Sequence, residues 1–405
     1  MDDVIAFMSN TTAGVEKDKT FIELLSRNEI QKVRDFQKSF PEYCITPLCR
    51  LQGLADHLNI DRIWIKNESC RFGLNSFKVL GSTYAIGKYL SKSIGKDIGD
   101  CPFDLLSSDS VKKKIGRKLF VTATDGNHGR AVAWAAKRFG HDSVVFLPRN
   151  SARIRLENII REGAEASILD MNYDDAVRYG KLYADQRGGV VVQDTAWEGY
   201  TDIPMWIMQG YATLIDEAME QLDALNERLP THVFLQAGVG SFAGAIQGYL
   251  YNLSVKKRPI TVIIEPQTAA CLFKSVESGE GEPYAVKGDL VTIMAGLACG
   301  EPNIVSLNIL RNFADAFIAC KDSVAARGMR ILGNPLNGDP IIIAGASGAV
   351  GLGVASLILE RREFEEVKDR LGLNQNSRIL VINTEGDTEP ELYRKIVWDG
   401  LFPLI

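Results

Sequence analysis

One segment of the 405-residue chain organises the rest of it: Arg71-Phe72-Gly73-Leu74-Asn75-Ser76-Phe77-Lys78-Val79-Leu80-Gly81. Lys78 lies between two apolar residues, and the apolar run that follows it is compatible with a helix. Lysines usually lie at surfaces because their ammonium group is strongly hydrated. Partial burial lowers the pKa of a lysine and frees its amine to act as a nucleophile and base. Lys78 is therefore a candidate catalytic residue, although a lysine whose stem lies along apolar surface would give the same pattern.

Composition places the chain among ordinary globular proteins. It is 46% apolar with a formal net charge of -5, and its length allows two domains with sizeable cores. This charge gives no electrostatic reason to expect nucleic acid or an anionic membrane as a partner. No apolar run reaches the roughly 18 residues of a membrane span. Met1-Asp2-Asp3-Val4 lacks the features of a secretory signal, so we expect a cytoplasmic protein.

Cysteine and histidine spacing predicts no metal site. The seven cysteines include no Cys-x-x-Cys pair, and the four histidines lack the spacing of metal ligands. We expect most of the cysteines to be buried free thiols, as is usual in the cytosol. A disulfide among the later cysteines remains open.

The order of the predicted elements indicates an α/β protein. Strands are expected at residues 63–68, 118–124, 143–147, 166–169, 189–193, 232–236, 261–265, 341–344 and 378–383. Helices are expected within 1–45, at 51–58, from 131, and at 152–162, 173–186 and 206–229, while 92–117 resembles a surface excursion. Continuous apolar strands that alternate with helices are typical of parallel sheets covered on both faces. The strands fall into two series, which predicts two such sheets.

A glycine-rich turn follows the strand predicted at 232–236, at Ala237-Gly238-Val239-Gly240-Ser241-Phe242. Glycines let the backbone approach an anion, and the N-terminus of the next helix presents unpaired N–H groups. The turn is therefore a candidate phosphate site. Such turns also occur in dinucleotide-binding proteins, and Gly244 with Glu265 keeps that alternative open.

Carboxylates follow two other predicted strands. Asp125 begins Asp125-Gly126-Asn127-His128-Gly129, and it could transfer a proton or simply cap the helix that follows. Asp194 lies in Gln193-Asp194-Thr195-Ala196-Trp197-Glu198-Gly199-Tyr200, where it could recognise a cationic group or serve as a turn residue. Ligand contacts of α/β proteins lie at such strand ends, so both are candidate site residues.

The sequence resembles the fold-type II pyridoxal-phosphate enzymes, the group of threonine dehydratases and the tryptophan synthase β-subunit. The resemblance spans residues 46–390 and includes the order Thr46-Pro47-Leu48, Lys66-Asn67-Glu68 and Ser76-Phe77-Lys78. It implies an α/β fold of two three-layer domains with mostly parallel sheets. Residues 1–80 and 200–405 would form the large cofactor-binding domain, and residues 81–199 a smaller inserted domain.

The resemblance also implies a cofactor, pyridoxal 5'-phosphate, attached to Lys78. Asn127 would donate a hydrogen bond to its phenolic oxygen. Thr384 is the candidate partner of its pyridine nitrogen, although Glu385 and Asp387 are also available. The residues expected to hold its phosphate are Gly238, Val239, Gly240, Ser241 and Phe242.

Two stretches narrow the resemblance to the diaminopropionate ammonia-lyases: Asp194 to Tyr200, and Met294-Ala295-Gly296-Leu297-Ala298-Cys299-Gly300-Glu301. That family implies α,β-elimination of D- and L-2,3-diaminopropionate to pyruvate and ammonia. Lys78 would take the Cα proton of the L-isomer, and Asp125, where most relatives carry Ser or Thr, that of the D-isomer. Asp194 and Thr195 would bind the amino-acid substrate. The family is usually dimeric, so we expect a homodimer.

Two other functions are compatible with the sequence. A serine- or threonine-type hydroxyamino-acid dehydratase would share the fold and the cofactor, but a neutral hydroxyl leaving group needs no anionic recogniser such as Asp125 or Asp194. A non-catalytic amino-acid or nucleotide sensor could use the same fold. A sensor without the lysine-bound cofactor would be colourless, which distinguishes it from the enzymes.

Overall fold

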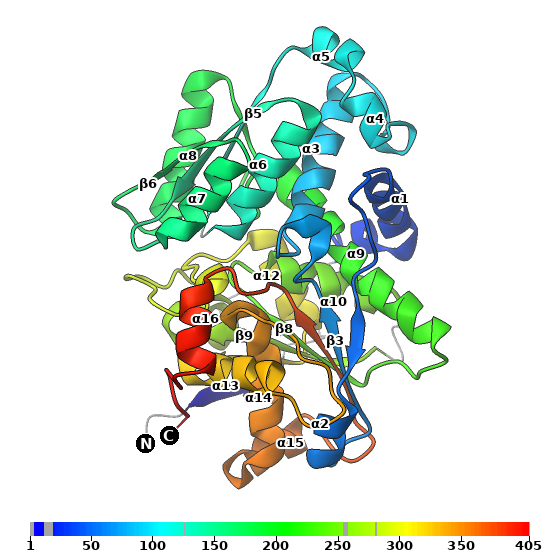
Figure 1. Cartoon of the computed structure of the whole chain (residues 1–405), viewed down its shortest axis with the longest axis vertical. Helices are drawn as coiled ribbons and strands as arrows, with labels where there is room; N and C mark the ends of the chain where they lie inside the picture. Colours follow the sequence, from blue (N-terminus) through cyan, green and yellow to red (C-terminus); the bar gives the residue numbers. More distant parts are fainter. Residues whose placement is uncertain (1–3, 12–18, 125, 254–257, 280–281, 405) are drawn as a thin grey trace.

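Two sheets organise the computed structural model, which describes residues 4–11, 19–124, 126–253, 258–279 and 282–404 (Figure 1). The strands are β1 (Ile5–Ser9), β2 (Leu48–Arg50), β3 (Arg62–Asn67), β4 (Leu119–Ala123), β5 (Asp142–Leu147), β6 (Glu165–Ile168), β7 (Val190–Val191), β8 (His232–Gln236), β9 (Ile260–Pro266), β10 (Ala316–Cys320) and β11 (Arg378–Asn383). The larger sheet has the order β1-β10-β9-β8-β11-β3-β2, and the smaller sheet the order β6-β5-β4-β7.

Most strand pairs are parallel. In the larger sheet the two edge strands, β1 and β2, run antiparallel to their neighbours, and the inner pairs are parallel. The pairs of the smaller sheet are all parallel. Strands β8 and β10 are buried along their whole length, as expected for strands covered on both faces. The predicted fold class, α/β with mostly parallel sheets, is confirmed.

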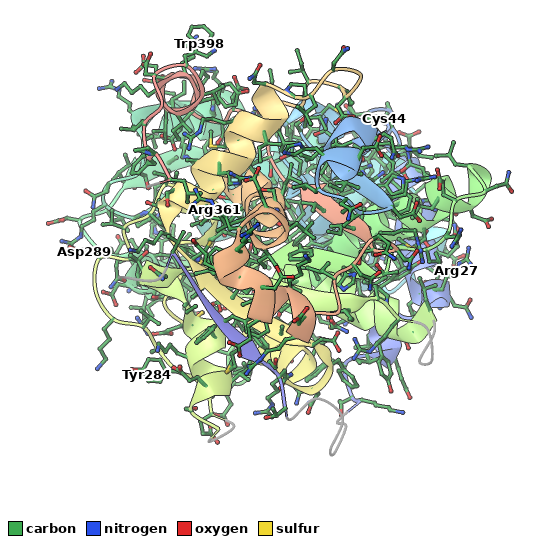
Figure 2. All side chains as sticks on the ribbon, turned by 90° about the horizontal axis from the view of Figure 1, so that it is seen from below. Arg27, Cys44, Tyr284, Asp289, Arg361 and Trp398 are labelled. Carbon is green, nitrogen blue, oxygen red and sulfur yellow. The ribbon has the colours of Figure 1, made fainter. Side chains whose placement is uncertain are left out.

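Helices cover both sheets. They are α1 (Arg27–Lys38), α2 (Gln52–His57), α3 (Val79–Ser93), α4 (Phe103–Leu106), α5 (Asp109–Ile115), α6 (Asn127–Phe139), α7 (Arg153–Arg161), α8 (Tyr173–Arg187), α9 (Asp202–Ala224), α10 (Ser241–Leu253), α11 (Cys271–Glu277), α12 (Ile304–Phe313), α13 (Asp322–Gly333), α14 (Ala346–Glu360), α15 (Glu365–Arg370) and α16 (Pro390–Val397). Side chains such as Arg27, Arg361 and Trp398 lie at the surface (Figure 2). No helix of the described ranges is long and apolar enough to cross a membrane.

Three predicted elements were wrong in part. Residues 341–344 form no strand: Ile341 is 70% exposed, and the carbonyl of Ile343 accepts a hydrogen bond from a side chain, Asn383 Nδ2 (3.2 Å). A short β-branched run needs a neighbouring strand to complete a ladder, and these residues belong to no described strand. Strand β10, which was missed, pairs with β9 in the larger sheet. The segment 92–117 contains α4 and α5, and it buries Phe103 and Leu106. Helix α9 ends at Ala224, before the predicted Leu229.

Helix α3 begins at the residue after Lys78 and crosses α9 closely. A Cβ atom at Gly81 would lie 2.5 Å from Tyr211 Cε1, and one at Gly210 would lie 2.3 Å from the Leu80 carbonyl oxygen. Both distances are far below van der Waals contact, so each position has room for glycine alone. The crossing therefore fixes the first turn of α3, and with it the place where Lys78 leaves the backbone.

Candidate active site

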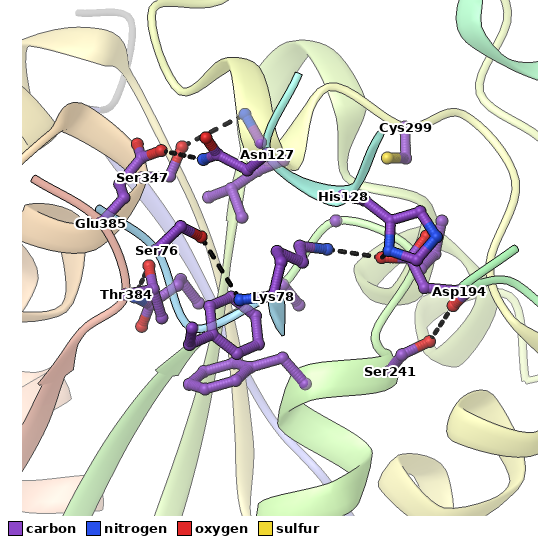
Figure 3. A pocket seen from close by; sticks show the side chains of 18 of the residues that line it. Ser76, Lys78, Asn127, His128, Asp194, Ser241, Cys299, Ser347, Thr384 and Glu385 are labelled. Atoms are coloured by element: carbon purple, nitrogen blue, oxygen red, sulfur yellow. Dashed lines mark hydrogen bonds and ion pairs between the residues drawn. The ribbon is translucent and has the colours of Figure 1, made fainter. Parts of the chain in front are cut away.

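Segments that follow strands of both sheets meet at one pocket (Figure 3). The segment after β8 supplies residues 237–242, the segment after β11 supplies Thr384 and Glu385, and the segment after β4 supplies Thr124. Lys78, Asn127 and Asp194 line the same pocket. The carboxyl ends of strands are where open α/β sheets bind ligands, so the topology explains why residues distant in sequence converge here.

Lys78 and Asp194 form a buried ion pair in this pocket. Lys78 Nζ lies 2.5 Å from Asp194 Oδ2, and the two side chains are 15% and 4% exposed. His128 Nδ1 lies 3.8 Å from the same oxygen, and the Tyr211 hydroxyl donates to it at 3.4 Å. Burial would raise the pKa of Asp194, but the charges of His128 and Lys78 hold that pKa well below its usual range. Asp194 is therefore an ionised carboxylate that faces the lysine.

The glycine-rich turn has the features of an anion site. Gly240 has φ +97°, a conformation that favours glycine. A Cβ atom at Gly238 would lie 3.1 Å from Cys299 Sγ, so a larger residue would fill the pocket wall. Ser241 begins α10, whose N-terminal N–H groups have no partner within their own helix. Its hydroxyl donates to the backbone carbonyl of Asp194, which ties the turn to the ion pair.

Two polar residues of the segment after β11 face the pocket. The Thr384 hydroxyl accepts a hydrogen bond from Gln236 Nε2 (3.0 Å), which leaves its own proton available to a ligand. Asn127 Nδ2 donates to Glu385 Oε2 at 2.5 Å. The third candidate at this strand end, Asp387, lies instead in an adjoining cavity.

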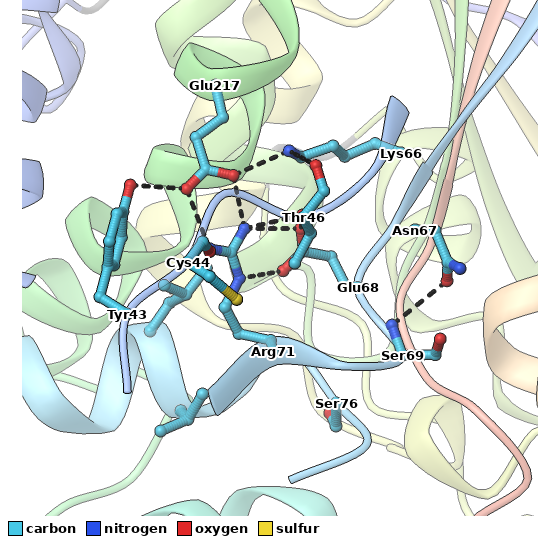
Figure 4. A network of polar contacts seen from close by, with 12 residues as sticks. Tyr43, Cys44, Thr46, Lys66, Asn67, Glu68, Ser69, Arg71, Ser76 and Glu217 are labelled. Carbon is cyan, nitrogen blue, oxygen red and sulfur yellow. Dashed lines mark hydrogen bonds and ion pairs between the residues drawn. The ribbon is translucent and has the colours of Figure 1, made fainter. Parts of the chain in front are cut away.

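A buried network of charged side chains supports the segment that leads to Lys78 (Figure 4). The side chains of Lys66, Glu68, Arg71 and Glu217 are 0% exposed. Arg71 donates to Glu68 Oε2 at 2.7 Å and to Glu217 Oε2 at 2.6 Å, and Lys66 donates to Glu217 Oε2 at 2.7 Å. Burial would raise the pKa of Glu217, but Arg71 and Lys66 lower it to about 2. Two cations thus balance two carboxylates, as buried charges require.

Most of the site residues expected from the sequence come together. Lys78, Asn127, Asp194, Thr384 and the turn from Gly238 to Phe242 all line the pocket. Thr195 lines a neighbouring cavity of about 490 Å³ instead. Asp125 lies outside the described residues.

Pocket residues outside the candidate set include Tyr173, Cys299 and Ser347, although Cys299 belongs to the stretch Met294 to Glu301 that the resemblance singled out. Ser347 follows Gly345 at the start of α14, and its Oγ accepts from the Gly296 N–H at 3.2 Å. The sequence feature that could have identified Ser347 is a serine beside a glycine at a helix start. Tyr173 carries no such signal, because its position depends on packing between distant segments.

The cysteines, all of which are described, are free thiols. Cys271 and Cys299 are buried, and Cys271 Sγ donates to the carbonyl of Gly238 at 3.7 Å. Within the described ranges, no group of three or more His, Cys, Asp or Glu side chains could hold a metal ion. The glycine-rich turn and Lys78 suit an organic anion with a reactive centre near the lysine.

Comparison with known proteins agrees with this geometry. A family model described as pyridoxal-phosphate dependent enzyme matches residues 40–385. Fold and site together thus define an enzyme of the pyridoxal-phosphate class. The phosphate group of that cofactor suits the glycine-rich turn, and its amine-reactive group suits Lys78. A diaminopropionate ammonia-lyase from Salmonella typhimurium is 47% identical over 401 residues, 99% of either chain.

Solved structures give the same result. The holo diaminopropionate ammonia lyase from Escherichia coli is 45% identical, covers 98% of both chains and has a TM-score of 0.91. The same enzyme in complex with an aminoacrylate-PLP azomethine reaction intermediate has a TM-score of 0.89 at the same identity and coverage. This chain belongs to the diaminopropionate ammonia-lyase family.

Proposed function

We propose that this chain eliminates the β-amino group of D- and L-2,3-diaminopropionate to give pyruvate and ammonia. The observation that carries the proposal is the ionised, buried Asp194 beside Lys78. A carboxylate in that place suits a substrate with a second amine. A hydroxyamino-acid dehydratase would expel a neutral hydroxyl and would have no use for this charge.

The residues of the pocket fit pyridoxal phosphate. Lys78 would hold it covalently, the turn from Gly238 to Phe242 would bind its phosphate, and Asn127 and Thr384 would contact its ring. The cofactor, when bound, withdraws electrons from Cα of the substrate and stabilises the negative charge that develops there.

The chain's own groups would supply the proton transfers. The Lys78 amine takes the Cα proton of the L-isomer, and Asp125 takes that of the D-isomer. Asp194 accepts hydrogen bonds from the substrate's β-ammonium group and keeps it protonated. A protonated amine leaves as neutral ammonia, so this carboxylate prepares the leaving group. Water then releases the second amine, which yields pyruvate.

The remaining parts of the proposal concern organisation. We assign residues 1–80 and 200–405 to the large domain and residues 81–199 to the small one, in line with the strands of the smaller sheet, which all lie between Leu119 and Val191. Thr195, in the neighbouring cavity, would affect the substrate through the position of Asp194. We also propose a homodimer that works in the cytoplasm.

The decisive experiment measures pyruvate release from purified, cofactor-loaded protein with D- and L-2,3-diaminopropionate and with D- and L-serine in parallel. We expect rapid turnover of both diaminopropionate isomers and slow turnover of serine. Lys78→Ala should lose both the visible absorbance of the bound cofactor and the activity. Faster turnover of serine would contradict the proposal and identify a dehydratase.

A further inference from the structure

Arg155 lies against the loop that leads into α6 and the pocket. It belongs to α7 and is 6% exposed. A Cβ atom at Gly126 would lie 2.9 Å from Arg155 Cδ and 3.1 Å from its Nη1, so the side chain is packed directly on the backbone of this loop. Gly126 has φ +144° and precedes Asn127, the pocket residue at the start of α6. The loop is therefore shaped on one side by an arginine that does not itself line the pocket.

The other end of Arg155 is bound to the segment after β11. Its Nε donates to Glu389 Oε1 at 2.7 Å, and its Nη2 donates to Thr388 Oγ1 at 3.2 Å. A planar guanidinium can make these two bonds at fixed angles, whereas a lysine ammonium could not reproduce both. Because the Arg155 side chain is almost fully buried, its contacts are shielded from the solvent that weakens surface ion pairs.

Gly126 and Asn127 are thus fastened to the segment after β11 at two points. Asn127 bonds to Glu385, and Arg155, packed on Gly126, bonds to Thr388 and Glu389. Between the two points lies a cavity of about 220 Å³ that borders Gly126, Asn127 and Arg155. Loss of the Arg155 contacts would leave the hydrogen bond from Asn127 to Glu385 in place, with open space beside it.

We propose that Arg155 is a positioning residue for Gly126 and thereby a determinant of D-isomer turnover. The inference rests on the proposed function, in which Asp125, the residue before Gly126, is the base for the D-isomer. Lys78, the base for the L-isomer, stands on a different segment, held by α9 and Asp194. Asn127 keeps its own hydrogen bond to Glu385, so disturbing Gly126 affects the two isomers unequally.

The test compares Arg155→Met, Arg155→Lys and Glu389→Gln in the cofactor-loaded enzyme. Arg153→Met is the matched control, because Arg153 lies on the same helix with a side chain that is 89% exposed. We expect Arg155→Met to lower kcat for the D-isomer about 100-fold, as for a displaced catalytic group, with a much smaller loss for the L-isomer and little change in KM. Arg155→Lys and Glu389→Gln should each lose less, and Arg153→Met should match the wild type.

A second measurement does not depend on turnover. Amide hydrogen exchange of peptides that cover residues 120–130 should be faster in Arg155→Met than in Arg153→Met, while the visible cofactor absorbance and the melting temperature stay close to wild type. Equal losses for the two isomers, or unchanged exchange, would overturn the inference. If the wild type turned over neither isomer, the proposed function would fail, and the exchange data would still decide whether Arg155 positions the loop.

Discussion

Replacing Arg71 with methionine tests whether charge balance holds the network behind Lys78. The arginine side chain is 0% exposed and donates to Glu68, Glu217, the Thr46 hydroxyl and the Cys44 carbonyl. Methionine keeps much of the volume but none of the donors. Lys66 would then face two buried carboxylates, one of them without a compensating charge.

The expected loss of unfolding free energy follows from this imbalance of buried charges. Removing one partner of a buried ion pair typically costs about 3–5 kcal/mol, because the remaining charge stays desolvated. Net stabilities of folded proteins are about 5–15 kcal/mol, so the Arg71→Met protein should unfold at clearly lower urea concentration and temperature. In Arg71→Met/Glu217→Gln, Lys66 and Glu68 balance again. This double variant should be less destabilised than the sum of the two single variants by about 0.5–3 kcal/mol.

Urea unfolding followed by circular dichroism, with all proteins cofactor-loaded at pH 7, measures these differences. Arg27→Met is the control, since Arg27 is exposed at the edge of the molecule (Figure 2). An unfolding midpoint of Arg71→Met equal to that of the control would refute the reasoning. Strictly additive losses in the double variant would show that packing, and not charge balance, holds the network.

Three further predictions concern single residues. Asp194→Asn should lower kcat for both isomers about 100-fold, measured by pyruvate release, because a neutral amide cannot keep the β-amine protonated; unchanged kcat would contradict this role. Burial raises the pKa of Glu265 to about 8, above its value of about 4.5 in the unfolded chain, so its contribution to stability is full below pH 4.5 and is lost as the pH rises to about 8. Urea midpoints between pH 5 and 8 should therefore fall more steeply for the wild type than for Glu265→Gln, and parallel curves would disprove the shift. Gly240→Ala should weaken cofactor binding about tenfold in equilibrium dialysis, because φ +97° is strained for alanine by about 1–3 kcal/mol; an unchanged dissociation constant would mean that the turn adapts.

Local patterns predicted the fold class, and the resemblance supplied most of the candidate site residues. Continuous apolar strands such as β8 are recognisable because both faces are buried, and Thr384 and the turn from Gly238 follow such strands, where parallel topology brings them together. Lys78 lies well beyond the end of β3, at the start of α3. Strand β10 was missed, although its five residues, Ala316–Cys320, are apolar or small and all buried. Residues 341–344 have the stronger β-branched signal, yet they lack a partner strand.

Contacts between distant segments could not be predicted. Glu217 lies in the middle of α9, and nothing in its neighbourhood along the chain shows that Arg71 and Lys66 are its partners. The contact of Arg155 with Gly126 depends in the same way on how α7 packs, and the turn of Thr195 away from the pocket depends on backbone direction within a short loop. The spacing of residues along the chain does not contain this information.

The close crossing of α3 and α9 has a consequence for how the chain can change in length. Because Gly81 packs against α9, the number of residues between Gly81 and Lys78 determines where the lysine lies. One residue inserted between Lys78 and Gly81 would turn the amine about 100° around the helix axis, away from Asp194. Insertions between α3 and α4, where Gly95, Lys96 and Asp97 are exposed, would leave that count unchanged. In a pool of single-residue insertions selected for activity, the chain should therefore accept extra residues after α3 and reject them within its first turn.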